Sequence, residues 1–135
     1  MFKFFKKKNI KAKQINNIYS QHLYTGLNGV LMRYCHNELE KTNPKKNCKK
    51  ILEIGAGSEP HYTYLKNKDC EYFVLENLKD NSFKKNKNIK YFYYDGNKIR
   101  FKKSYFDRII ISHTLEHIPF PEKFLKSVLK TLKKG

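Results

Sequence analysis

A short apolar run that ends in glycine constrains this chain more than any other feature. Lys50–Ile54 is followed at once by Gly55 and Gly57. A run of this length bounded by glycines is typical of a buried strand that enters a sharp turn. A helical pattern over 61–67 and a second apolar run, Glu71–Glu76, come next. The three segments together predict a β-α-β unit.

The rest of the chain continues this alternation. Strands are predicted over 89–95 and 106–112, and a final helix is predicted from Pro121 to Leu132. One side of that helix is expected to be apolar, with Phe124, Leu125, Val128, Leu129 and Leu132. Strands that alternate with helices in this way form a mostly parallel sheet with helices on both faces. The sequence therefore predicts an α/β fold with a Rossmann-like sheet, of which four strands are present.

The region before Cys48 divides into two parts. Residues 1–20 are basic and polar and predict a solvated N-terminal arm. Weak contact between its phenylalanines, Phe2, Phe4 and Phe5, and a membrane surface is the alternative. Residues 21–47 carry apolar positions at helical spacing and predict a helical segment. Together, residues 21–135 are expected to form one partial domain, in which 48–135 holds the strands.

The start of the chain and its cysteines indicate a reducing compartment. The first residues are positively charged but lack the apolar run of roughly 7–15 residues that a signal peptide contains. No segment approaches the roughly 20 apolar residues that cross a bilayer. Cys35, Cys48 and Cys70 are odd in number and widely spaced, which fits neither a disulfide framework nor a zinc site. A cytoplasmic protein with reduced thiols and no metal is expected.

The charge of the chain is strongly positive, with 29 Lys and Arg against 12 Asp and Glu. Such an excess normally suggests a polyanionic partner. Only Arg33, Arg100 and Arg108 are arginine, however, and arginine supplies the forked donors that read phosphates and guanines. The chain is also rich in Asn, Ile, Phe and Tyr, so AT-rich coding explains the lysines without such a partner. Nucleic acid is therefore not the expected partner, although a basic RNA-binding protein remains an alternative.

Acidic residues mark the ends of the predicted strands, where a ligand lies in such sheets. Glu76 follows Glu53 by 23 positions, close to the spacing of about 20 for a carboxylate that binds a ribose hydroxyl pair. Asp95 lies 19 positions further on and could accept a hydrogen bond from an adenine amino group. Glu59 stands where a pyrophosphate-binding turn has its third glycine, and its charge disfavours NAD and FAD. The pattern suits an adenosine without phosphate.

Two stretches of the chain resemble a known family. Residues 51–58, Ile-Leu-Glu-Ile-Gly-Ala-Gly-Ser, look like the first motif of class I S-adenosylmethionine-dependent methyltransferases. Residues 105–119, Tyr-Phe-Asp-Arg-Ile-Ile-Ile-Ser-His-Thr-Leu-Glu-His-Ile-Pro, look like the fourth-strand region of their small-molecule and lipid branch. The resemblance covers about 48–135 and implies the strand order 3-2-1-4.

The resemblance also implies a binding site for S-adenosylmethionine. Its methionine end would lie by the first turn, its ribose by the second strand end, its adenine by the third and its sulfonium by the fourth. In chain order the implied residues are Glu53, Gly55, Ala56, Gly57, Glu76, Asn77, Asp95, Gly96, Ser112 and His113. The implied acceptor is a small molecule, a sugar or a lipid-linked group.

Methyl transfer needs little from the protein beyond placement of the two reactants. A general base is required only if the acceptor has a proton to lose. His113 is the first candidate and His117 the second, although histidines at such places also serve in packing or hydrogen bonding.

A complete domain of this family has seven strands, and only four are predicted here. The chain is therefore expected to be truncated at its C-terminus. Such a fragment is expected to be inactive alone, or to work only with a partner chain that supplies the missing strands. The alternative is a non-catalytic module that uses the half-sheet for binding.

Overall fold

The computed structural model describes residues 25–43, 47–57, 59–77, 86–94 and 99–134. The chain divides into two compact units, residues 1–42 and 43–135. The described part of the first unit is helix α2, Gly26–Lys41. Its buried residues recur every three or four positions, which is the period of one helix face, and are Gly29, Met32, His36 and Glu40.

Most of the apolar residues that predicted this helix lie outside its buried face. The side chains of Leu27, Val30, Leu31 and Tyr34 are all more than half exposed. The pattern thus indicated the helix correctly but not the stripe of it that is buried. Glu38 helps to end the helix, because its carbonyl accepts from the Thr42 hydroxyl and its carboxylate pairs with Lys41.

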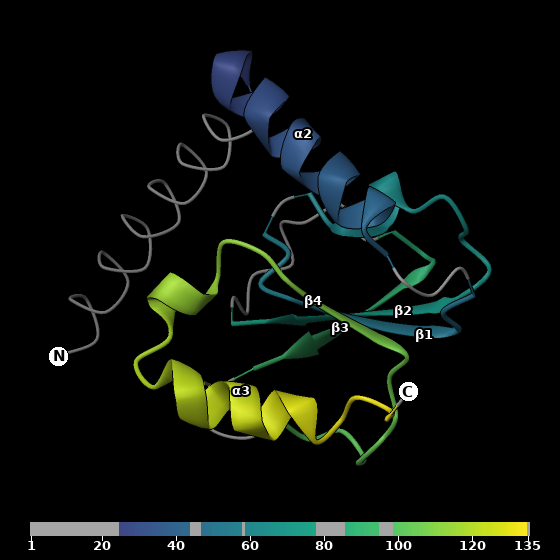
Figure 1. Cartoon of the computed structure of the whole chain (residues 1–135), viewed down its shortest axis with the longest axis vertical. Helices are drawn as coiled ribbons and strands as arrows, with labels where there is room; N and C mark the ends of the chain where they lie inside the picture. Colours follow the sequence, from purple (N-terminus) through teal and green to yellow (C-terminus); the bar gives the residue numbers. More distant parts are fainter. Residues whose placement is uncertain (1–24, 44–46, 58, 78–85, 95–98, 135) are drawn as a thin grey trace, which may run out of the picture. The chain divides into compact units, whose positions relative to one another are not determined.

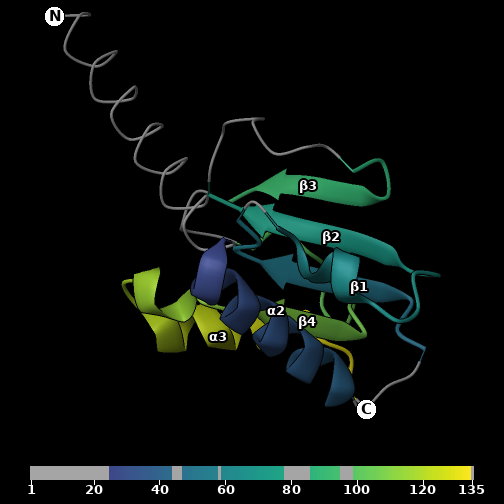
Figure 2. The ribbon, with the colours of Figure 1, turned by 90° about the horizontal axis from the view of Figure 1, so that it is seen from above.

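The second unit is built on four parallel strands: β1 (Lys50–Ile54), β2 (Glu71–Glu76), β3 (Ile89–Tyr93) and β4 (Arg108–Ile111). They lie in the order β3-β2-β1-β4 (Figures 1 and 2). Strand β1 is hydrogen-bonded on both sides, with Ile51 opposite Tyr72 of β2 and opposite Arg108 of β4. The predicted sheet and its strand order are confirmed.

Each face of this sheet carries a helix of the same unit. Helix α3 (Pro121–Leu129) covers one face, where Phe124 and Val128 pack with Leu52, Ile54 and Phe73 in the main core. Figure 1 shows α3 lying along that side of the strands.

The opposite face is covered by the short 3-10 helix η1, His61–Tyr64. The ring of its Tyr62 meets the ring of Tyr72 edge-on, with centroids 5.3 Å apart. Because successive side chains of a strand point to opposite faces, β1 is buried on both sides. The prediction of helices on both faces is confirmed within this unit.

The end of α3 differs from the sequence expectation. The helix stops at Leu129 because the Thr131 amide and hydroxyl both donate to the Val128 carbonyl, and the chain then turns back. Leu132 forms a parallel bridge with Phe106 instead of a further helical turn. Leu129, the last residue of the helix, is 60% exposed, so its expected place on the apolar side is wrong.

Helix η2 (Leu115–His117) connects β4 to α3. Strand β4 is shorter than the expected 106–112, since Phe106 pairs with Leu132 and not with β1. Among the described residues, no helix has both the length and the apolar character needed to cross a membrane.

Phe106 is fully buried and its ring lies edge-on to those of Phe73, Phe101 and Tyr105. We expect Phe106→Ala to lower the free energy of unfolding by about 3–5 kcal/mol, because it removes the ring and leaves a cavity. Urea denaturation followed by circular dichroism would measure this. Phe120→Ala, at a site 74% exposed, is the matched control and should change stability by less than about 0.5 kcal/mol. Equal effects of the two changes would contradict the assignment of the core.

Candidate functional site

The candidate site lies at the carboxyl ends of β1, β2 and β4. The sheet grows in opposite directions from β1, with β2 and β3 on one side and β4 on the other. This reversal of strand order is where ligands bind in open α/β sheets. The chain brings three segments together there: the turn after β1, the end of β2 and the segment after β4.

Glu76 links the end of β2 to the glycine turn. Its carboxylate Oε2 accepts from the Gly57 amide (3.1 Å) and Oε1 accepts from the Asn77 amide (2.9 Å). Its carbonyl accepts from the Tyr94 amide. The side chain is half-buried, so its position is fixed by backbone donors while it still reaches the surface. Each carboxylate oxygen retains a further lone pair for a ligand.

The two glycines of the turn serve different purposes. Both have left-handed backbones, with φ of 72° at Gly55 and 58° at Gly57. A Cβ at Gly55 would lie 2.2 Å from the Thr114 hydroxyl oxygen, so this glycine lets the segment after β4 approach. A Cβ at Gly57 would meet no atom within 4 Å. Gly57 therefore leaves open space beside Glu76, whereas Ala56 between the glycines is buried.

Thr114 connects the segment after β4 to β1. Its hydroxyl donates to the Ser112 carbonyl (2.9 Å) and lies 3.2 Å from the Ile54 carbonyl oxygen. His113, between Ser112 and Thr114 in the sequence, has a φ of 52°. This left-handed conformation costs a residue with a Cβ about 1–2 kcal/mol. The His113 side chain is exposed, and His117 at the end of η2 is exposed as well. Neither histidine is packed in the core.

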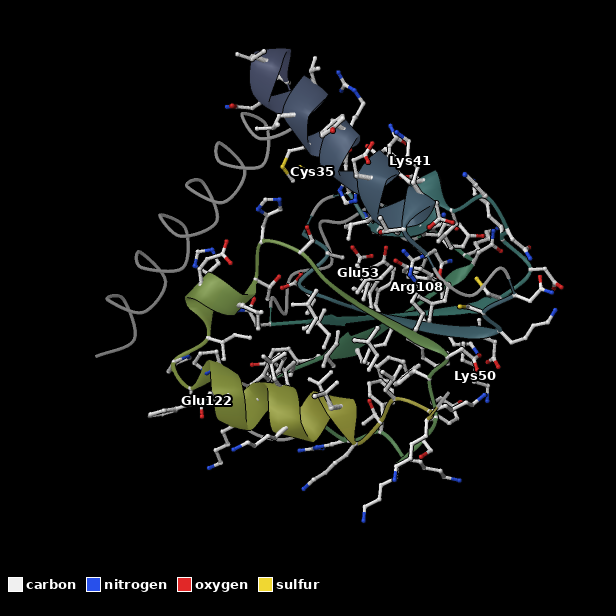
Figure 3. All side chains as sticks on the ribbon, in the orientation of Figure 1. Cys35, Lys41, Lys50, Glu53, Arg108 and Glu122 are labelled. Carbon is white, nitrogen blue, oxygen red and sulfur yellow. The ribbon has the colours of Figure 1, made fainter. Side chains whose placement is uncertain are left out.

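Glu53 lies beneath the turn and not at its surface. It is only 2% exposed, and Figure 3 shows it close to Arg108 on the same side of the sheet. Its carboxylate accepts from the Tyr72 hydroxyl (2.7 Å) and from the His61 amide (3.0 and 3.1 Å). Protein donors thus occupy this carboxylate, which ties η1 and β2 to the base of the glycine turn.

Burial dominates the electrostatics of Glu53. It raises the pKa of the carboxyl to about 7, against the opposing effect of the donors Tyr72 and His61. The nearby charge of Glu76 raises this pKa further, and that of Arg108 lowers it. Burial, followed by the Glu53 charge, also raises the pKa of Tyr72 well above its usual value. The Tyr72 hydroxyl therefore keeps its proton and remains a donor.

The structure brings most of the predicted residues to one end of the sheet. Asp95 and Gly96 lie outside the described residues. Within the described part of the chain, no group of three or more metal-binding side chains occurs. Sequence reasoning missed Tyr72 and Thr114. A glutamate inside an apolar strand was the available signal for Tyr72, since a buried carboxylate requires a donor on a neighbouring element.

Comparison with known proteins points to one family. A family model described as a methyltransferase domain matches residues 27–135. Among curated proteins no match was found. Solved structures with a similar fold include the YcgJ protein of Bacillus subtilis, with 20% identity and a TM-score of 0.64 over 76% of this chain and 47% of that one.

Two further solved structures are similar. One is a SAM-dependent methyltransferase of Thermotoga maritima, with 20% identity and a TM-score of 0.63 over 90% of this chain and 55% of that one. The other is coclaurine N-methyltransferase bound to N-methylheliamine and S-adenosylhomocysteine, with 16% identity and a TM-score of 0.56 over 82% and 34%. At these identities the likeness concerns the fold. The chain spans about half the length of the first two structures and 34% of the third.

The pKa of Glu53 predicts how stability depends on pH. An unfolded glutamate has a pKa of about 4.3, so between about 4.3 and 7 the folded chain binds the proton that the unfolded chain has lost. This contribution to stability is complete below about pH 4 and is lost as the pH rises through about 7. Relative to Glu53→Gln, which does not titrate, the wild type should lose roughly 3 kcal/mol across this range in urea denaturation. Glu59→Gln, at an exposed site, keeps Glu53 and should therefore lose stability over the same pH range as the wild type.

The close approach of Thr114 to Gly55 predicts that substitution of Gly55 and of Gly57 lowers stability by unequal amounts. Gly57→Ala should cost only the left-handed strain of about 1–2 kcal/mol, whereas Gly55→Ala adds a clash and should cost clearly more. Thermal unfolding of both variants would measure the difference. Adding Thr114→Ala to Gly55→Ala should recover part of the loss, since the two nearest clashing atoms are removed. No recovery would show that strain alone governs Gly55.

Proposed function

The chain belongs to the methyltransferase domain family, and we propose that its second unit binds S-adenosylmethionine at the carboxyl ends of β1, β2 and β4. The proposed reaction is transfer of the cofactor's methyl group to an acceptor. In this proposal residues 48–135 form the cofactor-binding half of the domain.

The observation that carries the proposal is the pairing of Glu76 with Gly57. The Glu76 carboxylate is held by the Gly57 and Asn77 amides at the edge of open space. A ribose offers two adjacent hydroxyl donors, which match the two oxygens of one carboxylate. We therefore assign the ribose to Glu76 and Asn77, and the methionine end to the turn of Gly55, Ala56 and Gly57.

The charge of the site supports a cationic ligand over a phosphate. Glu59 follows the glycine turn directly and is exposed, and the Glu76 carboxylate contacts the turn through the Gly57 amide. A pyrophosphate would be repelled there, whereas a sulfonium and an ammonium group would be attracted. The proposal leaves Glu53 as a positioning residue, because its oxygens are occupied by Tyr72 and His61.

The remaining roles are proposed from the family resemblance. We assign the sulfonium side to Ser112 and His113, and the adenine border to Asp95 and Gly96. When bound, the cofactor supplies an already activated methyl group. The protein then has to hold the acceptor in line with it and exclude water. His113 is proposed as the base for an acceptor that loses a proton, with His117 as the second candidate; both are exposed.

The acceptor is proposed to be a small molecule, a sugar or a lipid-linked group, because 105–119 resembles the branch that uses such acceptors. Among the described strands, β4 pairs only with β1, so it is an edge strand of the described sheet. We propose that a further strand, from a longer chain or a partner chain, covers this edge when the acceptor site is assembled. A half-sheet that binds the cofactor without catalysis is the alternative.

Calorimetric titration with S-adenosylhomocysteine tests the proposal. The wild type should bind in the micromolar range, and Glu76→Gln should weaken binding at least about tenfold, since a charged acceptor of the ribose is lost. Gly57→Val should abolish binding, because its side chain would fill the open space. Glu59→Gln removes the same charge nearby and is the matched control, with an expected change below about threefold.

Circular dichroism of each variant separates loss of binding from loss of folding. A folded wild type that does not bind would contradict the proposal. Equal losses in Glu76→Gln and Glu59→Gln would contradict the assignment of Glu76 to the ribose.

A further inference from the structure

Two segments that carry lysines meet at the amino end of β4. They are distant from each other in the sequence, and backbone hydrogen bonds join them. The Ser104 amide donates to the Lys130 carbonyl (3.0 Å), and the Lys133 amide donates to the Phe106 carbonyl (2.9 Å). Figure 1 shows the end of α3 and the C-terminal residues beside the segment that precedes β4. We call the resulting surface the lysine face. Its exposed members are Lys102, Lys103, Lys126, Leu129, Lys130, Lys133 and Lys134.

The lysine face has little negative charge to balance it. Elsewhere on the sheet, Lys49 pairs with Asp69, and Lys50 and Lys90 both pair with Glu71. On the lysine face, Lys133 pairs with Asp107. Its other five lysines form no ion pair with any residue in the described part of the chain. A coding bias accounts for the number of lysines but not for this separation from carboxylates.

Helix α3 reinforces the asymmetry. Its single carboxylate, Glu122, lies in the first turn, as Figure 3 shows, whereas Lys126 and Lys130 lie toward the other end. Like-charged side chains this close repel one another, so an external anion would stabilise the arrangement. The lysine face is therefore a surface with a net attraction for a polyanion.

Leu129 adds an apolar side chain to this surface. It lies three positions after Lys126 and directly before Lys130, and it is 60% exposed. The buried side of α3 is already packed into the core through Phe124 and Val128, so Leu129 is a separate apolar point among lysines.

We propose that the lysine face binds the surface of a membrane that contains anionic lipids. Such a surface attracts lysine regardless of side-chain geometry, and its headgroup boundary accepts an apolar side chain such as Leu129. Nucleic acid is less suited, because the face contains no arginine fork and a leucine gains nothing beside a phosphate. The proposal does not depend on the function proposed for the candidate site, which lies at the opposite ends of the strands.

The lysine face and the candidate site lie at opposite ends of the sheet. The lysine face lies at the amino end of β4, and the candidate site lies at the carboxyl ends of β1, β2 and β4. A membrane bound at the lysine face leaves the site uncovered.

Co-sedimentation of the full chain with lipid vesicles tests the proposal. Binding is expected to vesicles of phosphatidylcholine mixed with phosphatidylserine, to weaken as salt is raised, and to be absent with phosphatidylcholine alone. Each lysine near such a surface contributes about a fivefold gain in binding, so Lys126→Glu with Lys130→Glu should weaken it by more than about twentyfold. Leu129→Ser should weaken binding at every salt concentration without changing the salt dependence.

The matched control is Lys68→Glu with Lys87→Glu, which makes the same change in net charge at exposed lysines outside the lysine face, before β2 and β3. It should leave most of the binding intact. Absence of binding to the mixed vesicles would overturn the proposal, as would an equal loss in the control, which would point to the net charge or to the basic N-terminal residues. Tighter binding to single-stranded RNA, unaffected by Leu129→Ser, would overturn the choice of lipid. Thermal unfolding of each variant confirms that the compared proteins are folded.

Discussion

Strand β1 is the element on which the second unit depends, because its backbone is bonded to β2 along one edge and to β4 along the other, at the point where the strand order reverses. Its side chains are buried on both faces, toward α3 through Leu52 and Ile54 and toward η1 through Ile51 and Glu53. Removing the backbone of such a strand from water is tolerable only when its amides and carbonyls are paired. The position of β1 therefore fixes where its neighbours run, and the turn that follows it must open at the edge of the sheet.

The geometry of the glycine turn is set by β1 and by the contacts that the turn makes with β2, with the segment after β4 and with Glu53. On one side the Gly55 amide donates to the Leu75 carbonyl of β2, and on the other Thr114 approaches the same glycine from the segment after β4. Below, Glu53 holds the His61 amide and so sets where the chain leaves the turn. The open space at Gly57 thus results from three contacts at other residues, none of which involves a ligand. Contacts between protein groups thus hold the candidate site in shape, and such preorganisation reduces the entropy that a ligand's binding would cost.

Much of this arrangement could be predicted from the sequence, and the failures have physical causes. The strands were predictable because short apolar runs bounded by glycine or polar residues have few other solutions in a chain of this size. The end of α3 was not, since Leu132 continues the helical spacing but pairs with Phe106, a contact between distant segments. Glu53 is predicted beside the ligand from its place in the motif, and this stays a prediction. Its partners Tyr72 on β2 and the His61 amide could not be predicted, because both are contacts between separate segments. Patterns along the chain report local structure well, but they do not show which partner a polar side chain finds.

The pairing of Glu53 with Tyr72 also limits how this sequence can change over evolutionary time. Losing one partner of a buried hydrogen bond leaves the other unsatisfied, whereas replacing both together can be nearly neutral. A related chain that lacks Tyr72 is therefore expected to differ at position 53 as well. Because the His61 amide is a backbone group that only a proline substitution would remove, position 53 is expected to keep an acceptor oxygen in such chains. Positions 53 and 72 are thus expected to change together. Position 72 can exchange one hydrogen-bond donor for another, while position 53 keeps an acceptor.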